Sequence, residues 1–211
     1  MLNWFLFYLW AFLLGALLYI PGIAWYSRLN VKPHLIIALA PSFSVIVLAA
    51  TMTVAELASW LVPWHGYVLL IAALAALGMW LNRSNLRRIA NSTAAKSPST
   101  AFLYLAVSLV IVTWIYVKSL DGPNSFIPLF DNAHTLSTIQ SFAKTGCYGP
   151  LLSSAYLDAP QLFPGLSYYP AVLHSISALT ANMFGCGVSE ALNILVFDLL
   201  FMAMPLSVRS L

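Results

Sequence analysis

Charged residues are scarce in this sequence. Of its 211 residues, 7% are Asp, Glu, Lys or Arg and 61% are hydrophobic. An ordinary soluble domain has roughly a quarter of its residues charged. A water-soluble fold is therefore excluded, and apolar runs of bilayer length predict an all-α integral membrane protein.

Cysteine is nearly absent as well. Cys147 and Cys186 are the only two, and their spacing does not indicate a zinc site. The nine Lys and Arg residues lie between apolar runs instead of forming a stripe with aromatic residues, so nucleic acid is not an expected partner. No basic segment or cleavage site precedes the first apolar run, which we expect to be retained as a span.

The apolar runs predict about six transmembrane helices. Four fall within residues 1–118, and two further segments fall within 168–211. Pro21-Gly22 is expected to end or kink the first span, and residues 83–96 are expected to form a hydrophilic connector that cannot bury a core. The expected spans are about Trp4–Trp25, His34–Val62, Tyr67–Leu81, Ala101–Val117, Pro170–Phe184 and Glu190–Val208.

Basic residues predict the orientation, because basic flanks resist translocation. Six of them lie in the two connectors that alternate to one face, which should be cytoplasmic: Arg28, Lys32, Arg83, Arg87, Arg88 and Lys96. The N-terminus and residues 119–167 then lie outside. Cys147 would be outside and Cys186 inside, which precludes a disulfide. Arg209 would lie outside against the charge rule, a conflict that a re-entrant fifth segment would remove.

The long loop at 119–167 is expected to be ordered. A connection of this length is usually functional or disordered, and its many apolar side chains argue against disorder. Leu136, Ile139 and Phe142 recur at helical spacing. We therefore expect a short amphipathic helix over about 132–144, lying along the membrane surface. Gly146 is the expected C-cap.

Asp131 and His134 are the strongest catalytic candidates in this loop. Three residues apart on one helical turn, they would face the same way. A carboxylate and an imidazole could then converge on a substrate hydroxyl as general bases, or hold a divalent metal ion. The alternative explanation is common: Asp131 would be the helix N-cap, and His134 would have no special role.

For the other polar residues, both a functional and a structural interpretation are open. His174 lies one turn inside the fifth segment, where burial requires a partner, although a bond to a backbone carbonyl would suffice. Asp158 lies in a proline-bounded turn and is more often structural. Glu56 and Asp198 lie within spans and could mark a proton or ion path. They stand alone, without neighbouring acids.

A set of short motifs resembles the C-type (GT-C fold) glycosyltransferases, in particular a bacterial branch of multi-spanning membrane proteins. The motifs cover about residues 120–195, with two more upstream: Asp131-x-x-His134, Thr145-Gly146, Tyr168-Tyr169-Pro170-x-x-x-His174, Phe184-Gly185, Ser189-Glu190-Ala191-Leu192-Asn193, and upstream Ile20-Pro21-Gly22 and Leu39-Ala40-Pro41.

The resemblance implies a location and an activity. It implies the plasma membrane of a bacterium and transfer of a sugar from a polyprenyl-phosphate donor, a membrane lipid, to an extracytoplasmic acceptor. Asp131 would be the base or a metal ligand, and His134 would orient it or share the cation. Asp158, Tyr168, Tyr169 and His174 are the candidate substrate-binding residues.

The pattern departs from better-known members in two ways. Their loop follows the first span, whereas here it follows the fourth. They also have further spans and a basic external region for the donor phosphate. We therefore expect this chain to resemble an amino-terminal portion that is inactive alone. The competing hypotheses are a non-catalytic assembly protein and a transporter component.

Overall fold

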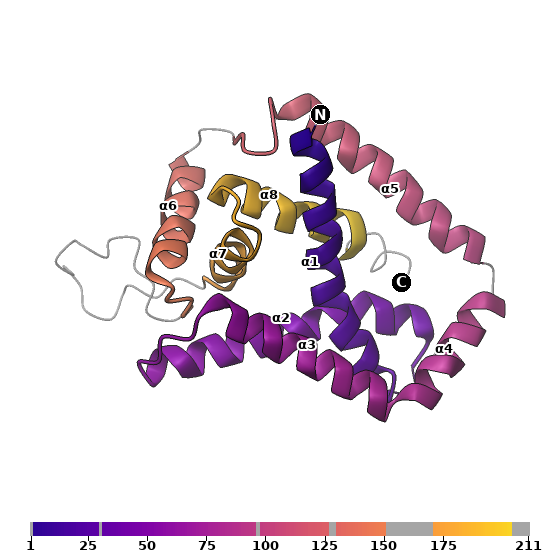
Figure 1. The fold of residues 1–211 in the computed structure, drawn as a ribbon. Helices are drawn as coiled ribbons and strands as arrows, with labels where there is room; N and C mark the ends of the chain where they lie inside the picture. Colours follow the sequence, from indigo (N-terminus) through magenta and orange to yellow (C-terminus); the bar gives the residue numbers. More distant parts are fainter. Residues whose placement is uncertain (1, 30, 96–97, 127–129, 151–170, 204–211) are drawn as a thin grey trace.

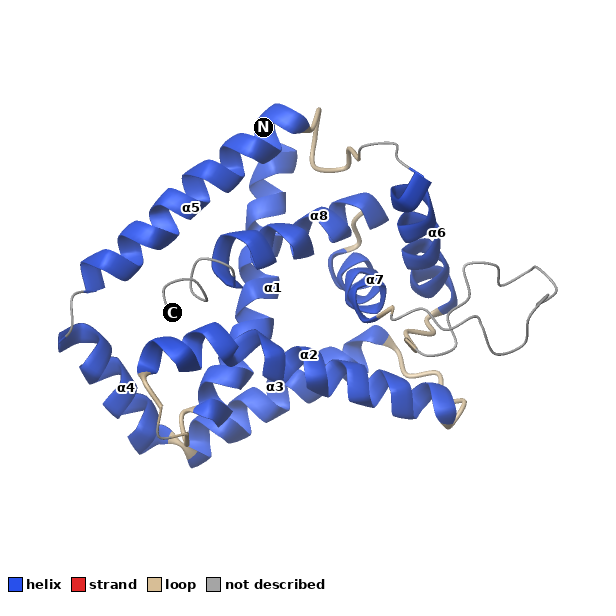
Figure 2. Ribbon diagram, turned by 180° about the vertical axis from the view of Figure 1, so that it is seen from behind, coloured by secondary structure: helices blue, strands red, loops and turns tan. Residues whose placement is uncertain are grey.

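The computed structural model describes residues 2–29, 31–95, 98–126, 130–150 and 171–203, and every regular element in these ranges is a helix (Figures 1 and 2). The order is α1 (Leu2–Tyr26), α2 (Pro33–Leu57), α3 (Trp64–Leu81), α4 (Arg83–Ala95), α5 (Pro98–Ser119), α6 (Phe130–Thr145), α7 (Val172–Phe184), α8 (Val188–Asp198) and the π-helix η1 (Leu199–Ala203).

Three of the described helices are long and apolar enough to cross a membrane. They cover Asn3–Tyr26, Leu35–Leu57 and Trp64–Leu81. A fourth candidate is the pair Val172–Phe184 and Val188–Phe201, which is bent by 114° at the short break between them. The chain is thus consistent with a membrane protein. The six spans expected from the sequence stay a prediction, since α5 contributes a shorter apolar helix, Leu103–Ser119, to the described residues.

Helix α1 continues through Pro21, where the sequence predicts an end or a kink. The helix runs on to Tyr26 with Pro21 inside it. Pro21 is buried, and proline is tolerated inside membrane helices because neighbouring helices compensate for the lost hydrogen bond. The pair therefore does not end the helix, and a kink at this position stays a prediction.

Gly22 allows helices α1 and α2 to cross at close distance. A Cβ atom at Gly22 would collide with the backbone of Ala40 on α2, its carbonyl oxygen included. One turn earlier, the Ser44 hydroxyl on α2 donates to the Leu18 carbonyl oxygen at 2.8 Å. Small residues that let backbones approach, together with interhelical hydrogen bonds, are the usual means of association in membranes.

Helix α3 packs on α1 through a second glycine. A Cβ atom at Gly78 would lie 2.9 Å from the Trp25 Nε1 atom and 3.0 Å from the Ala24 Cβ atom. The same Trp25 Nε1 donates to the Leu74 carbonyl oxygen at 2.9 Å. Helix α1 therefore forms the common partner of α2 and α3.

Both ends of the α2–α4 region differ from expectation. Helix α2 ends at Leu57 instead of near Val62, because Ser59 takes a positive φ of 55° and the Trp60 amide bonds back to the Ala55 carbonyl. At the other end, the expected hydrophilic connector forms helix α4. It buries Ile89, so one apolar residue among many polar ones is enough to anchor it.

Aromatic rings pack helices from the two ends of the chain against each other. Phe197 of α8 meets Phe7 of α1 edge-on at 5.5 Å between ring centroids, and it meets Tyr116 of α5 at 5.6 Å. Figures 1 and 2 both show α5 to one side of the molecule, joined to the end of α3 by α4. Its Tyr116 end is thus fastened to α1 and α8.

Helix α7 is enclosed by protein. All residues from His174 to Ala181 are buried, and α6, α8, α3 and α2 contact this helix. It ends at Gly185, whose φ of 64° gives the left-handed C-cap. The enclosure of α7 brings the loop-borne helix α6 onto the bundle.

Candidate functional site

The amphipathic helix predicted in the long loop is confirmed as α6. It spans Phe130–Thr145, slightly longer than expected. Its C-cap is also confirmed, because Gly146 has a φ of 70° and donates its amide to the Phe142 carbonyl oxygen at 2.9 Å. Its buried residues are Thr138, Ile139 and Phe142, and they lie in a helix that contacts α7. The apolar face thus covers protein.

Asp131 is the second residue of α6, within its first turn. The interpretation of Asp131 as the N-cap requires a helix that starts after Asp131, whereas α6 starts at Phe130. Residues 127–129 and the Asp131 side chain lie outside the described part of the structure. An acid in the first turn is favoured there by the positive end of the helix dipole. Asp158, Tyr168 and Tyr169 also lie outside the described residues.

His134 and His174 are brought together by the packing of α6 on α7. His134 is half-buried on the second turn of α6, and its carbonyl oxygen accepts hydrogen bonds from the Ser137 and Thr138 hydroxyls at 2.9 Å and 3.0 Å. His174 is buried, and it lies close enough to His134 for the two rings to interact electrostatically. Among the described residues, no group of three or more His, Cys, Asp or Glu forms a metal site.

The segment leaving α6 is fastened to α7 by Asn182. The Asn182 Nδ2 atom donates to the Tyr148 hydroxyl oxygen at 2.6 Å and to the Ala143 carbonyl oxygen at 3.0 Å. Burial raises the pKa of Tyr148 above its ordinary value, and the hydrogen bond from Asn182 acts against this. Asn182 thus ties both α6 and its exit segment to α7.

The same segment packs on the end of the α2–α3 hairpin. The Tyr148 ring meets the Tyr67 ring edge-on, with 5.7 Å between centroids. Gly149 lies so close to Glu56 that an added Cβ would collide with the carboxyl group. Glu56 is in the last turn of α2, as the sequence suggests. Tyr148 and Gly149 of the long loop therefore contact the hairpin formed by α2 and α3.

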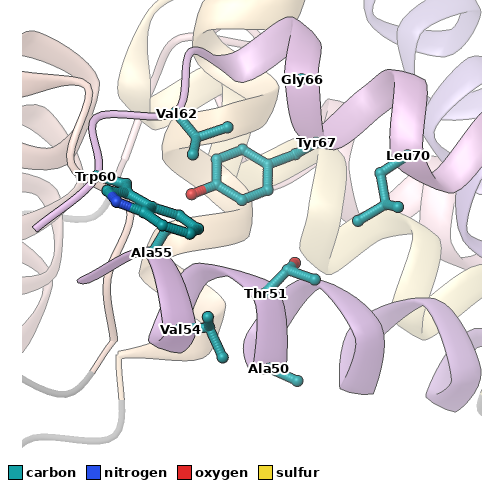
Figure 3. A pocket seen from close by; sticks show the side chains of 9 residues that line it. All are labelled: Ala50, Thr51, Val54, Ala55, Trp60, Val62, Gly66, Tyr67 and Leu70. Atoms are coloured by element: carbon teal, nitrogen blue, oxygen red, sulfur yellow. The ribbon is translucent and has the colours of Figure 1, made fainter. Parts of the chain in front are cut away.

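An apolar pocket of about 340 Å³ opens beside this contact (Figure 3). Its wall includes the Tyr67 ring, with Trp60 and Val62 near the Tyr67 hydroxyl (Figure 3). Thr51 contributes little polarity, because its hydroxyl donates to the Val47 carbonyl oxygen at 2.8 Å. The full lining is Ala50, Thr51, Val54, Ala55, Trp60, Val62, Gly66, Tyr67 and Leu70.

Residues in the first turns of α8 hydrogen-bond the segment with which the long loop begins. The Ser189 hydroxyl donates to the Asn124 carbonyl oxygen at 2.7 Å. The Asn193 Nδ2 atom donates to the carbonyl oxygens of Pro123 and Ser125 at 2.8 Å and 3.0 Å. Glu190 is buried and hydrogen-bonds the Asn124 side chain. The motif from Ser189 to Asn193 therefore positions the main chain just after α5.

A family model for DUF6541, a family of unknown function, matches residues 15–211. The chain belongs to this family. No curated protein and no solved structure matches the chain. The family match extends from the middle of α1 through α8, so it includes both ends of the loop and the helices that hold them.

Sequence reasoning missed the residues that assemble this site in the DUF6541 protein. No role is predicted for Tyr148 or Asn182, although an Asn inside an apolar helix requires a partner. The Ser189 to Asn193 motif was noticed only through its resemblance. Its hydrogen bonds to Pro123, Asn124 and Ser125 depend on residues more than sixty positions away.

Proposed function

We propose that this DUF6541 protein is a GT-C-like membrane glycosyltransferase. It transfers a sugar from a polyprenyl-phosphate donor to an acceptor on the non-cytoplasmic side of a bacterial plasma membrane. One observation carries the proposal: the long loop folds into α6, docks on α7 and the α2–α3 hairpin, and places Asp131 and His134 in the first two turns of α6.

The proposed orientation rests on contacts at opposite ends of α2. This helix has 25 residues, a length of about 37 Å, which spans a bilayer core. Gly149 of the loop contacts Glu56 at its C-terminal end. The connectors that carry Arg28 and Arg83 lie at the other end, and they are basic, so that end is cytoplasmic in the proposal.

The bend between α7 and α8 revises the proposed span count. Helix α8 starts beside Asn124, at the loop end of the bundle. If α7 is re-entrant, the chain enters the membrane from the outer side and returns to that side, and α8 then crosses towards the cytoplasm. The chain crosses five times instead of six, and Arg209 lies on the cytoplasmic side, in agreement with the charge rule.

In the proposed reaction, Asp131 accepts the proton of the acceptor hydroxyl as its oxygen attacks the anomeric carbon. The bond from that carbon to the phosphate oxygen breaks, and polyprenyl phosphate leaves. His134 orients the carboxylate, and Asp158, Tyr168, Tyr169 and His174 are the proposed substrate contacts. The apolar pocket beside Tyr67 suits hydrocarbon of the donor.

Transfer assays on membranes that contain the protein test this proposal. A panel of polyprenyl-phosphate hexoses and pentoses is supplied, and released polyprenyl phosphate is quantified by chromatography. Asp131→Asn should lower the rate by about 100-fold or more, since a general base contributes at least that much. Asp121→Asn is the matched control, because Asp121 is an exposed acid of the same loop.

Two outcomes contradict the proposal. Consumption of no donor by the intact wild-type protein in its native membranes would remove the transferase function. Full activity of Asp131→Asn, with normal membrane abundance, would remove the base and favour a non-catalytic assembly role for the loop.

A further inference from the structure

Asp198 is a buried acid that the proposed reaction does not use. It is the last residue of α8, and its side chain is 3% exposed. Its Oδ2 atom has no hydrogen-bond partner among the described residues. An acid inside a membrane span is costly and marks a functional position by default.

Two tyrosines from other helices lie near Asp198. Tyr19 of α1 and Tyr116 of α5 both lie within electrostatic range of its carboxyl group. The Tyr116 hydroxyl donates to the Asn193 carbonyl oxygen at 3.3 Å. The Tyr19 hydroxyl is buried and, like Oδ2 of Asp198, has no partner in the described part of the chain. Polar groups from α1 and α8 are therefore left without protein partners in the same region.

The backbone changes at this position. Helix α8 gives way to the π-helix η1 directly after Asp198. Single π-turns within α-helices are rare and are frequently found at functional sites. Asp198 thus combines an unusual backbone with an unusual side-chain environment.

The charge state of Asp198 follows from the groups that surround its carboxyl. No Lys or Arg of the described residues acts on the Asp198 carboxyl, and Phe197 beside it packs among the rings of Phe7 and Tyr116. An ionised carboxylate without a cationic partner is strongly disfavoured in such a place, whereas a neutral carboxylic acid is tolerated.

We propose that Asp198 is an intramembrane proton-binding site. Its carboxyl group holds a proton as the neutral acid between α1, α5 and α8. Release of the proton would leave an uncompensated buried charge, so the protonated form is favoured in this packing. The site is independent of sugar transfer.

Glu190 provides an internal comparison. It lies two turns earlier on α8 and is also buried, but it has a hydrogen bond to the Asn124 side chain. Burial disfavours the ionised form of both acids, and at Glu190 the hydrogen bond to its carboxylate offsets part of this effect. The two acids should therefore differ in protonation although both are buried.

Labelling with dicyclohexylcarbodiimide tests the proposal, because this reagent modifies protonated carboxyl groups in apolar surroundings. The acid proton moves to a carbodiimide nitrogen, and the carboxyl oxygen bonds to the carbodiimide carbon. The product rearranges to a stable N-acylurea without any oxidant or reductant. The full chain in lipid nanodiscs is labelled, digested and analysed by mass spectrometry.

We expect the label on Asp198 to exceed that on Glu190 by at least about tenfold, given the cost of a buried unpaired charge. Labelling should fall as the pH is raised and should be unaffected by sodium chloride. Asp198→Asn, a neutral isostere, should remove this label and keep the wild-type elution profile. Glu190→Gln is the matched control and should leave the Asp198 label unchanged.

Two results would overturn the proposal. The first is an unlabelled Asp198 in folded wild-type protein at mildly acidic pH. The second is protection by sodium chloride, which would make this a cation site instead. If Asp198→Asn does not fold, the infrared carboxylic-acid band of Asp-isotope-labelled wild-type protein decides, since its absence at neutral pH contradicts a bound proton.

Discussion

The Arg28 guanidinium donates a hydrogen bond from Nε to Oδ1 of Asn82 at 2.6 Å. Asn82 in turn donates from Nδ2 to the Ala24 carbonyl oxygen at 2.9 Å. Asn82 is 2% exposed, so these bonds are shielded from water. They join the ends of α1 and α3, and they bring together the two basic connectors that the sequence assigns to one face.

Replacement of Asn82 should therefore weaken the whole bundle. Asn82→Ala leaves the Ala24 carbonyl and the Arg28 guanidinium without this partner, and we expect a loss of about 1–3 kcal/mol. Thermal unfolding in detergent measures it. Ser84→Ala, at an exposed position of α4, should change stability little. Equal effects of the two substitutions would contradict the structural role of Asn82.

A methyl group at Gly22 should separate α1 from α2. Gly22→Ala gains helix propensity, but its Cβ meets the backbone of Ala40, which cannot rotate away as a side chain could. We expect a net loss of about 1–3 kcal/mol from overpacking, seen as a lower unfolding temperature. Gly122→Ala is the control glycine, because its Cβ would have one neighbour, at 4.0 Å. A stabilised Gly22→Ala protein would rule out this crossing.

Tyr148 should make the folded protein sensitive to alkaline pH. Its pKa in the folded state is raised by burial above the ordinary value of 10.0, so the folded state favours the protonated phenol. The contribution is fully present below the ordinary value and is lost as pH rises through the raised one. Unfolding temperatures of Tyr148→Phe should fall less steeply in this range than those of the wild type.

The matched control for this titration is Tyr104→Phe. Tyr104 is exposed on α5, and its replacement should leave the alkaline limb of the stability curve unchanged. If Tyr104→Phe and Tyr148→Phe gave the same curve, the alkaline loss would have another source.

Cys147 reports the side of the membrane on which the loop lies. It is exposed, so a membrane-impermeant maleimide added to intact cells should label it in a Cys186→Ser background. A cysteine placed at exposed Ser84 on α4, in a chain without the two native cysteines, should react only after the cells are opened. The reverse pattern would invert the proposed orientation.

Local signals explain what the sequence predicted well. Gly146 is a glycine after a periodic apolar stretch, and the structure has the C-cap of α6 at that residue. The predicted span Tyr67–Leu81 is apolar along its length, and it lies in a single helix, Trp64–Leu81. Such features depend on neighbours within one or two turns, which are visible in the sequence.

Long-range contacts explain what it predicted poorly. Pro21 is a local reason to end a helix, yet the packing of α1 on α2 at Gly22 and Ala40 favours its continuation. The pairing of Tyr148 with Asn182 depends on two helices meeting. In the same way, the lack of a hydrogen-bond partner for the Asp198 Oδ2 atom among the described residues depends on which side chains of α1 and α5 surround it, and no local motif predicts this.

The middle of helix α7 is shielded from the surroundings, since every residue from His174 to Ala181 is buried. Several of these residues are polar, among them Ser175, Ser177 and Thr180, and a bare helix of this kind would be a poor guest in hydrocarbon. Its burial therefore depends on the helices that contact it, which are α2, α3, α6 and α8. Stable insertion of α7 should accordingly require these neighbours to be in place.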